Sequence, residues 1–232
     1  MNSGAVTKLV ITIDGPSCSG KSTVAKRVAE ALFFKHLNSG LLYRTLTYLG
    51  LTHFDLPNWP PDTIAENFLS SLAAFAVDFA KDSPDMQVAF GGKVINEVAN
   101  SSLVSQYVPI LSQVPAVRAF VKTKQHEAAA AFNLVADGRD CGTEVFPQAV
   151  VKIFLTASLE KRAEWAFGRA QQQDFEISLQ EIKEGLAKRD HLDKTRAISP
   201  LRQAPDAIVI DATELSLMDV LKKIICAVGS RI

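Results

Sequence analysis

Residues 9–22 read Leu-Val-Ile-Thr-Ile-Asp-Gly-Pro-Ser-Cys-Ser-Gly-Lys-Ser, and this stretch decides the fold. Its first part, Leu9 to Ile13, is a short apolar and β-branched run that is typical of a buried parallel strand. Its second part, Gly15 to Ser22, fits the pattern Gly-x-x-x-x-Gly-Lys-Ser/Thr of a phosphate-binding loop. Apolar residues then recur at helical spacing from Val24 to Leu32. Strand, loop and helix therefore follow one another as this motif requires.

The loop supplies several groups that can bind the phosphates of a nucleotide. Glycines at both ends let successive backbone N–H groups turn toward an anion, and the following helix adds the positive end of its dipole. We expect Lys21 to reach the β- and γ-phosphates and the hydroxyl of Ser22 to ligate Mg²⁺. The predicted ATP-binding residues are Gly15, Pro16, Ser17, Cys18, Ser19, Gly20, Lys21, Ser22 and Thr23.

Strands and helices alternate along most of the chain. After the loop, further candidate strands occur at 34–37, 133–136, 150–155 and 207–210. Because helical segments separate them, we expect an α/β fold of three layers, with five parallel strands covered by helices on both faces. The predicted helices span 24–32, 40–51, 116–132, 158–171, 179–188 and 216–228.

Residues 54–102 differ in character from the rest of the chain. The segments 75–79, 87–90 and 93–95 alternate like strands, and Gly91-Gly92 forms a turn before the last of them. They predict a small antiparallel insert rather than a further parallel layer. The domain prediction is therefore a core made by 1–53 and 103–232, and an insert made by 54–102.

The composition excludes several classes of protein. With 25 Lys and Arg against 25 Asp and Glu in 232 residues, the chain lacks the basic surplus with which proteins bind nucleic acid. Its three cysteines form no Cys-x-x-Cys pair, so a reducing cytosol fits better than a disulfide framework. No apolar run approaches the roughly 18 residues that span a bilayer, and Met1 to Lys8 is too short and polar for a signal peptide. We expect a cytoplasmic monomer with no nucleic-acid or membrane partner.

Polar motifs recur after the phosphate loop. They are, in chain order, Asn38-Ser39-Gly40 with Tyr43-Arg44, Asp137-Gly138-Arg139-Asp140 with Gly142-Thr143 and Phe146-Pro147, Lys188-Arg189-Asp190 with Asp193, and Arg196-Ala197 with Pro200-Leu201. Together with the phosphate loop they resemble the bacterial cytidylate kinase family over nearly the whole chain. The resemblance implies a P-loop kinase fold in which the insert covers the acceptor monophosphate. The short, polar segment 168–178 is expected to be either a lid that closes over the phosphates or a plain connection between two helices.

The resemblance also implies ATP-dependent, in-line phosphoryl transfer to CMP or dCMP with Mg²⁺ as the cofactor. Such a reaction brings two polyanions together, so it needs cations, and arginine binds phosphate oxygens two at a time. The implied catalytic residues are Lys21, Arg139, Arg189 and Arg196. Arg162 is a candidate for a further ATP contact or for a surface role, because its helix lacks the paired arginines of the family. The implied CMP-binding residues are Ser39, Arg44, Arg118, Arg139, Asp140, Arg189, Asp193 and Arg196.

Individual roles follow from the resemblance and from chemistry. Asp140 can accept the exocyclic amino hydrogens of cytosine, whereas Arg118 can donate to the ring nitrogen or carbonyl oxygen. Uracil presents an oxygen to Asp140 instead, and this contact would be repulsive. The spacing of Arg189, Asp193 and Arg196 at i, i+4 and i+7 would place all three on one face of a continuing helix. The resemblance assigns the first two to the ribose side and the third to phosphate.

The chain departs from the family pattern at several positions. Pro109 stands where the family carries a base-contacting serine, and the nearest hydroxyls are those of Ser105 and Ser112. Asn38 replaces an acidic residue and Ser22 replaces a glycine. Two other functions fit the phosphate loop: a P-loop kinase for another small acceptor, such as UMP, shikimate or a cofactor precursor, and a module that binds ATP without transferring its phosphate.

Overall fold

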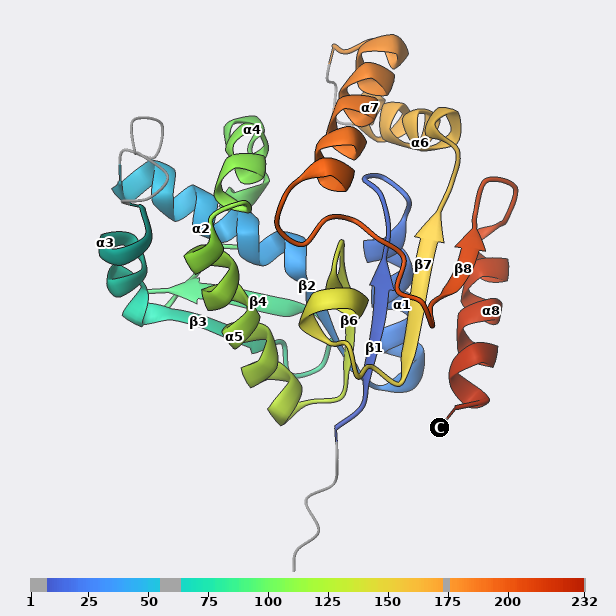
Figure 1. Ribbon diagram of the computed structural model, residues 1–232, viewed down its shortest axis with the longest axis horizontal. Coiled ribbons are helices and arrows are strands. Elements are labelled where there is room, and N and C mark those ends of the chain that lie inside the picture. Colours follow the sequence, from blue (N-terminus) through green and yellow to red (C-terminus); the bar gives the residue numbers. More distant parts are fainter. Residues whose placement is uncertain (1–7, 55–63, 173–175, 232) are drawn as a thin grey trace, which may run out of the picture.

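The computed structural model describes residues 8–54, 64–172 and 176–231. Its centre is a parallel sheet of five strands in the order β2-β6-β1-β7-β8 (Figure 1). This confirms the predicted α/β fold, and each strand begins one residue later than predicted. The strands are β1 (Val10–Asp14), β2 (Lys35–Asn38), β6 (Leu134–Gly138), β7 (Val151–Thr156) and β8 (Ile208–Asp211).

Strand β6 shows why a short, uninterrupted apolar run forms a central strand. Leu134 and Ala136 pack into one hydrophobic core, whereas Val135 between them packs into a second core. All three side chains are fully buried. Since neighbouring side chains of a strand point to opposite faces, helices must cover both faces of the sheet.

Two groups of helices cover the two faces. Apolar residues of α1 and α8 pack into the same core as Val135, and those of α2 and α5 pack into the core of Leu134. Helices α6 and α7 pack on each other beyond the carboxyl ends of the strands (Figure 1). The bounds are α1 (Lys21–Leu32), α2 (Ser39–His53), α5 (Pro115–Ala131), α6 (Leu159–Gln171), α7 (Leu179–Thr195) and α8 (Leu217–Gly229).

The described part of the insert holds a small antiparallel sheet in the order β3-β4-β5, as predicted. Phe75, Phe79 and Val88 of this sheet are buried in the same core as Leu134. The insert therefore continues the hydrophobic core on one side of the central sheet. Its elements are α3 (Ile64–Ser71), a 3₁₀ turn (Leu72–Ala74), β3 (Phe75–Phe79), β4 (Met86–Phe90), β5 (Lys93–Val94) and a second 3₁₀ turn (Val98–Asn100).

Helix α4 (Ser102–Leu111) is not among the predicted elements. The side chain of Ser101 caps its start by accepting the N–H of Val104, and Pro109 lies inside its last turn. Proline lacks an N–H donor and usually argues against a helix interior, so the sequence around Pro109 does not favour a helix. No helix among the described residues is long and apolar enough to cross a membrane.

Candidate active site

The phosphate loop connects β1 to α1 and packs closely against β7, which lies beside β1 in the sheet. A Cβ atom on Gly15 would lie 2.0 Å from the carbonyl oxygen of Leu155, so only glycine fits at this point. The Lys21 side chain is buried, and its ammonium donates to the carbonyl of Pro16 at 3.0 Å. Burial, and then the neighbouring Arg139, lower the pKa of Lys21 to about 7. A bound polyphosphate would offset both effects and keep this amine charged.

Ser22 and Asp137 form a pair of oxygen donors beside the loop. The hydroxyl of Ser22 donates to Asp137 Oδ2 at 2.7 Å. Asp137 is buried at the end of β6, directly opposite Ile13 in the parallel pairing with β1. Hydroxyl and carboxylate oxygens are the ligands that Mg²⁺ prefers, and phosphates usually complete its shell. The pair therefore fits a magnesium site, although no cluster of three or more His, Cys, Asp or Glu suited to a metal occurs in the described residues.

Asp137 was not among the predicted metal ligands. Its position at the carboxyl end of a strand beside the phosphate-loop strand is the signal that could have identified it. Burial raises its pKa, but the hydrogen bond from His36, with the nearby Lys21 and Ser22, outweighs this and leaves the pKa below its ordinary value. The carboxylate is therefore ionised at neutral pH and able to bind a cation.

The predicted cations gather around two adjoining cavities. Lys21 lines the larger, of about 480 Å³, and Arg118 and Arg196 line the smaller, of about 110 Å³. Three arginines line both cavities: Arg44, Arg139 and Arg189.

Arg139 links the phosphate loop to α7. Its Nε donates to Asp193 Oδ2 at 2.7 Å, and its Nη2 donates to the Ser17 hydroxyl at 2.6 Å. Burial, and then the charge of Arg139, lower the pKa of Arg189, which lines the same two cavities. The site thus concentrates positive charge from segments that lie far apart in the sequence.

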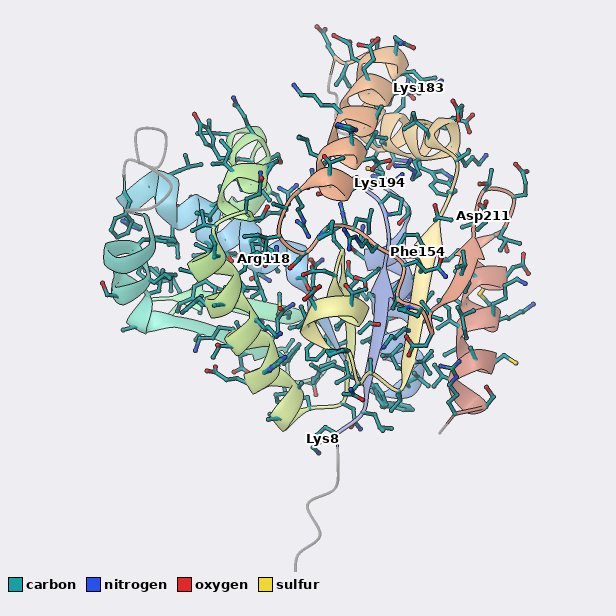
Figure 2. The ribbon with its side chains drawn as sticks, in the orientation of Figure 1. Lys8, Arg118, Phe154, Lys183, Lys194 and Asp211 are labelled. Atoms are coloured by element: carbon teal, nitrogen blue, oxygen red, sulfur yellow. The ribbon has the colours of Figure 1, made fainter. Side chains whose placement is uncertain are left out.

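A buried ion pair lines the smaller cavity. Arg118 Nη2 donates to Asp140 Oδ2, and Arg118 Nη1 donates to the carbonyl of Ser112 at 3.1 Å. The guanidinium also lies over the ring of Tyr43, 5.6 Å from its centroid. Figure 2 shows Arg118 on α5, on the insert side of the sheet. Burial raises the pKa of Asp140, and Arg118 and then Arg196 oppose this effect.

Arg196 differs from the predicted helical arrangement. Arg189 and Asp193 do lie four residues apart on α7, but the helix ends at Thr195 and Arg196 is extended (φ −57°, ψ 142°). Its Nε donates to the carbonyl of Ser199 at 2.7 Å, and its Nη2 lies 3.8 Å from Asp140 Oδ1. Ser199, directly before Pro200, has a positive φ of 48°, so the helix does not resume between Arg196 and Pro200. Arg196 therefore reaches the cavity from a loop rather than from the helix face.

Arg162, predicted to contact ATP, lies behind the phosphate loop. Its guanidinium donates to the carbonyls of Ala157 and Ser17, both at 3.0 Å, and pairs with Asp190 at 2.7 Å. It is not among the described residues that line the two cavities. In this structure Arg162 supports the backbone of the loop, and direct contact with ATP stays a prediction.

The departures from the family pattern have clear structural settings. Pro109 lines the smaller cavity together with Ser112, whose hydroxyl donates to the carbonyl of Pro109 at 3.3 Å. Ser105 is instead bonded to Arg44, at 3.0 Å. Asn38 caps α2 by accepting the N–H of Leu41 at 2.9 Å. Asn38 thus keeps the side-chain oxygen of the acidic residue that it replaces in the family pattern, without the negative charge.

Two further predictions concern Ser39 and the lid. Ser39 is buried, lines the smaller cavity and accepts a hydrogen bond from Gln125 at 2.7 Å. The predicted lid, 168–178, joins the end of α6 to the start of α7, but its residues 173–175 lie outside the described part of the chain. Its closing motion stays a prediction.

Comparison with known proteins finds a family model and relatives that match nearly the whole chain. The family model described as "Cytidylate kinase" matches residues 11–230. A cytidylate kinase of Bacillus cytotoxicus is 38% identical over 223 residues, which cover 96% of each chain. Cytidylate kinases of Anoxybacillus flavithermus and Chlamydia trachomatis serovar D are each 39% identical, over 97% of this chain and 98% and 100% of theirs. An uncharacterised protein from Eubacterium ventriosum, 15% identical, shares the fold with a TM-score of 0.52 over 97% of this chain and 100% of its own.

Proposed function

Because this chain belongs to the cytidylate kinase family, we propose that it transfers the γ-phosphoryl group of ATP to CMP and dCMP. The observation that supports this most directly is the buried Arg118–Asp140 pair, which lines the smaller cavity, beside the larger cavity that the phosphate loop lines. One end of the site then suits a cytosine base, and the other suits a polyphosphate. The insert would cover the acceptor.

On the ATP side, the phosphate loop and Lys21 bind the β- and γ-phosphates, and Ser22 and Asp137 hold Mg²⁺. Mg²⁺ held there would supply positive charge that offsets the negative charge of the phosphates. Arg162 keeps the loop in place through the carbonyl of Ser17. The backbone N–H groups of the loop can then meet the phosphates without rearrangement.

Transfer needs positioning and neutralisation of charge rather than a general base. The phosphate of a nucleoside monophosphate has a second pKa of about 6, so it is already ionised at neutral pH. Arg44, Arg139, Arg189 and Arg196 draw the two phosphate groups together and stabilise the charge that shifts during in-line attack. Their guanidinium groups keep their charge throughout.

Asp140 gives the preference for cytosine. Its carboxylate can accept the amino hydrogens of cytosine, whereas uracil would present an oxygen to a buried negative charge. Arg118 holds Asp140 in place and can also donate to the base. Pro109 offers no hydroxyl to the base, so Ser112, which lines the same cavity, is the nearest replacement.

The test is the rate of ADP formation with CMP, dCMP, UMP and AMP, each at the same concentration. We expect CMP and dCMP to be used far better than UMP and AMP. Equal rates of ADP formation with CMP and UMP would show that the protein does not select cytosine, and would support a kinase for another acceptor. ADP formation that does not depend on any acceptor, or no transfer at all, would instead support a nucleotide-binding module.

A further inference from the structure

His36 is a buried histidine of β2 that contacts the predicted metal site. Its Nε2 lies 2.7 Å from Asp137 Oδ1, and both residues are almost fully buried. The other carboxylate oxygen, Oδ2, accepts the hydroxyl of Ser22 at 2.7 Å. The two oxygens of Asp137 thus have different partners, one toward the phosphate loop and one away from it.

The position of His36 is itself fixed by the insert. Its backbone N–H donates to the carbonyl of Pro84, in the turn between β3 and β4, at 2.8 Å. The neighbouring Lys35 donates to the carbonyls of Ala80 and Ser83 in the same turn, at 2.7 and 2.9 Å. Asp85 of this turn also pairs with Lys26 of α1 at 2.8 Å. Hydrogen bonds to the turn between β3 and β4 therefore fix the backbone of β2 at His36, and this keeps the imidazole next to Asp137.

We propose that His36 is a positioning residue that turns the Asp137 carboxylate toward Ser22 and so strengthens binding of the magnesium complex of the nucleotide. This inference rests on the proposed function only in assigning Mg²⁺ to Ser22 and Asp137. A carboxylate in a buried site can rotate or become protonated unless each oxygen has a partner. The imidazole N–H supplies the partner for Oδ1, and Oδ2 then remains directed at the loop. Partners of this kind, behind a metal ligand, commonly change metal affinity by about 10- to 100-fold.

The test compares His36→Leu with His36→Gln, because the glutamine amide can place a donor near the position of Nε2. Calorimetry measures the affinity for ADP with Mg²⁺ and with EDTA in place of Mg²⁺. We expect His36→Leu to lose about 10-fold or more of the gain in affinity that Mg²⁺ provides, with metal-free ADP affinity nearly unchanged. His36→Gln should keep most of that gain.

His126→Leu is the matched control, because its Nε2 also lies 2.7 Å from an oxygen, the carbonyl of Val145. If the leucine variant at position 36 does not fold, His36→Asn replaces it, since its shorter amide does not reach Oδ1. The inference is overturned if His36→Leu keeps the full magnesium-dependent gain, if His126→Leu loses as much of it, or if His36→Gln loses as much as His36→Leu. None of these measurements uses CMP, so a failure of the proposed acceptor would be seen separately.

Discussion

The carboxylate of Asp14 accepts a hydrogen bond from the backbone N–H of Gly142 at 2.7 Å. Its other oxygen accepts the N–H of Cys141 at 2.9 Å. These two bonds tie the end of β1 to the turn that directly follows Asp140. The buried carboxylate therefore helps to place Arg139 and Asp140 relative to the phosphate loop, although it lines neither cavity.

We predict that the chemical shift of the Gly142 backbone amide changes with pH near pH 6, as the Asp14 carboxyl titrates. Burial, opposed by its two backbone hydrogen bonds, raises the pKa of Asp14 to about 6. The folded protein then binds this proton more tightly than the unfolded chain, so the stability contributed is present below about pH 4 and is lost as the pH rises through 6. Amide chemical shifts between pH 4.5 and 7.5 should follow this titration. In Asp14→Asn the amide shift should stay flat, and a flat profile in the unsubstituted protein would contradict the prediction.

Gly142→Ala should weaken CMP binding and lower stability. An added Cβ would lie 2.8 Å from Thr12 Oγ1 and 3.3 Å from Asp14 Oδ2, so the turn must shift. We expect a loss of about 1–3 kcal/mol in the free energy of unfolding, together with a higher KM for CMP. Gly185→Ala is the control, because nothing lies within 4 Å of its added Cβ in α7. It should be neutral or stabilising, and equal effects of the two substitutions would refute the steric argument.

The sequence predicted the central strands β1, β6 and β7 well because they are largely buried and read as mostly apolar runs. It did not predict α4, because Pro109 argues against a helix there. It also considered Arg196 as part of a continuing helix, but that helix ends one residue earlier. The pairing of Asp137 with Ser22 depends on the alignment of β6 with β1, which no local pattern encodes. Contacts between other distant segments, such as Arg162 with Asp190, could not be predicted either, because they too depend on how the chain folds.

Arg196→Ala should abolish most phosphoryl transfer while ATP affinity changes little. Arg196 lies beside Asp140 and bonds to the Ser199 carbonyl, and it lines the smaller cavity but not the larger one. Its expected partner is therefore the acceptor or the phosphoryl group in transit. Steady-state kinetics and ATP binding by calorimetry separate the two effects. Equal losses of ATP affinity and of kcat would show that Arg196 acts on the donor.

Asp140→Asn should reduce the preference for CMP over UMP by about 10-fold or more, since a lost hydrogen bond to a charged group is worth about 1.5–3 kcal/mol. The asparagine amide can donate to uracil, whereas the carboxylate cannot. The ratio of kcat/KM for the two acceptors measures this preference. Because Arg118 loses its buried partner, a thermal melt must first show that the variant is folded. An unchanged ratio would place base recognition on other residues.

Arg162→Lys should lower ATP affinity if the arginine supports the loop as the structure indicates. A lysine ammonium can still meet a phosphate as a point charge, but it cannot reach the Ser17 carbonyl, the Ala157 carbonyl and Asp190 together. Direct contact with ATP would therefore predict a mild effect, and loop support predicts a large one. ATP binding by calorimetry distinguishes the two.

Stability must be separated from this role, because removing Arg162 leaves Asp190 buried without its partner. Breaking such a pair costs about 3–5 kcal/mol, whereas replacing both members by neutral residues costs much less. The double variant Arg162→Met with Asp190→Asn should therefore regain most of the stability lost in Arg162→Met alone. Its ATP affinity should remain low, because neither residue then holds the Ser17 carbonyl. If ATP affinity recovers together with stability, Arg162 serves the fold alone and the loop keeps its shape without it.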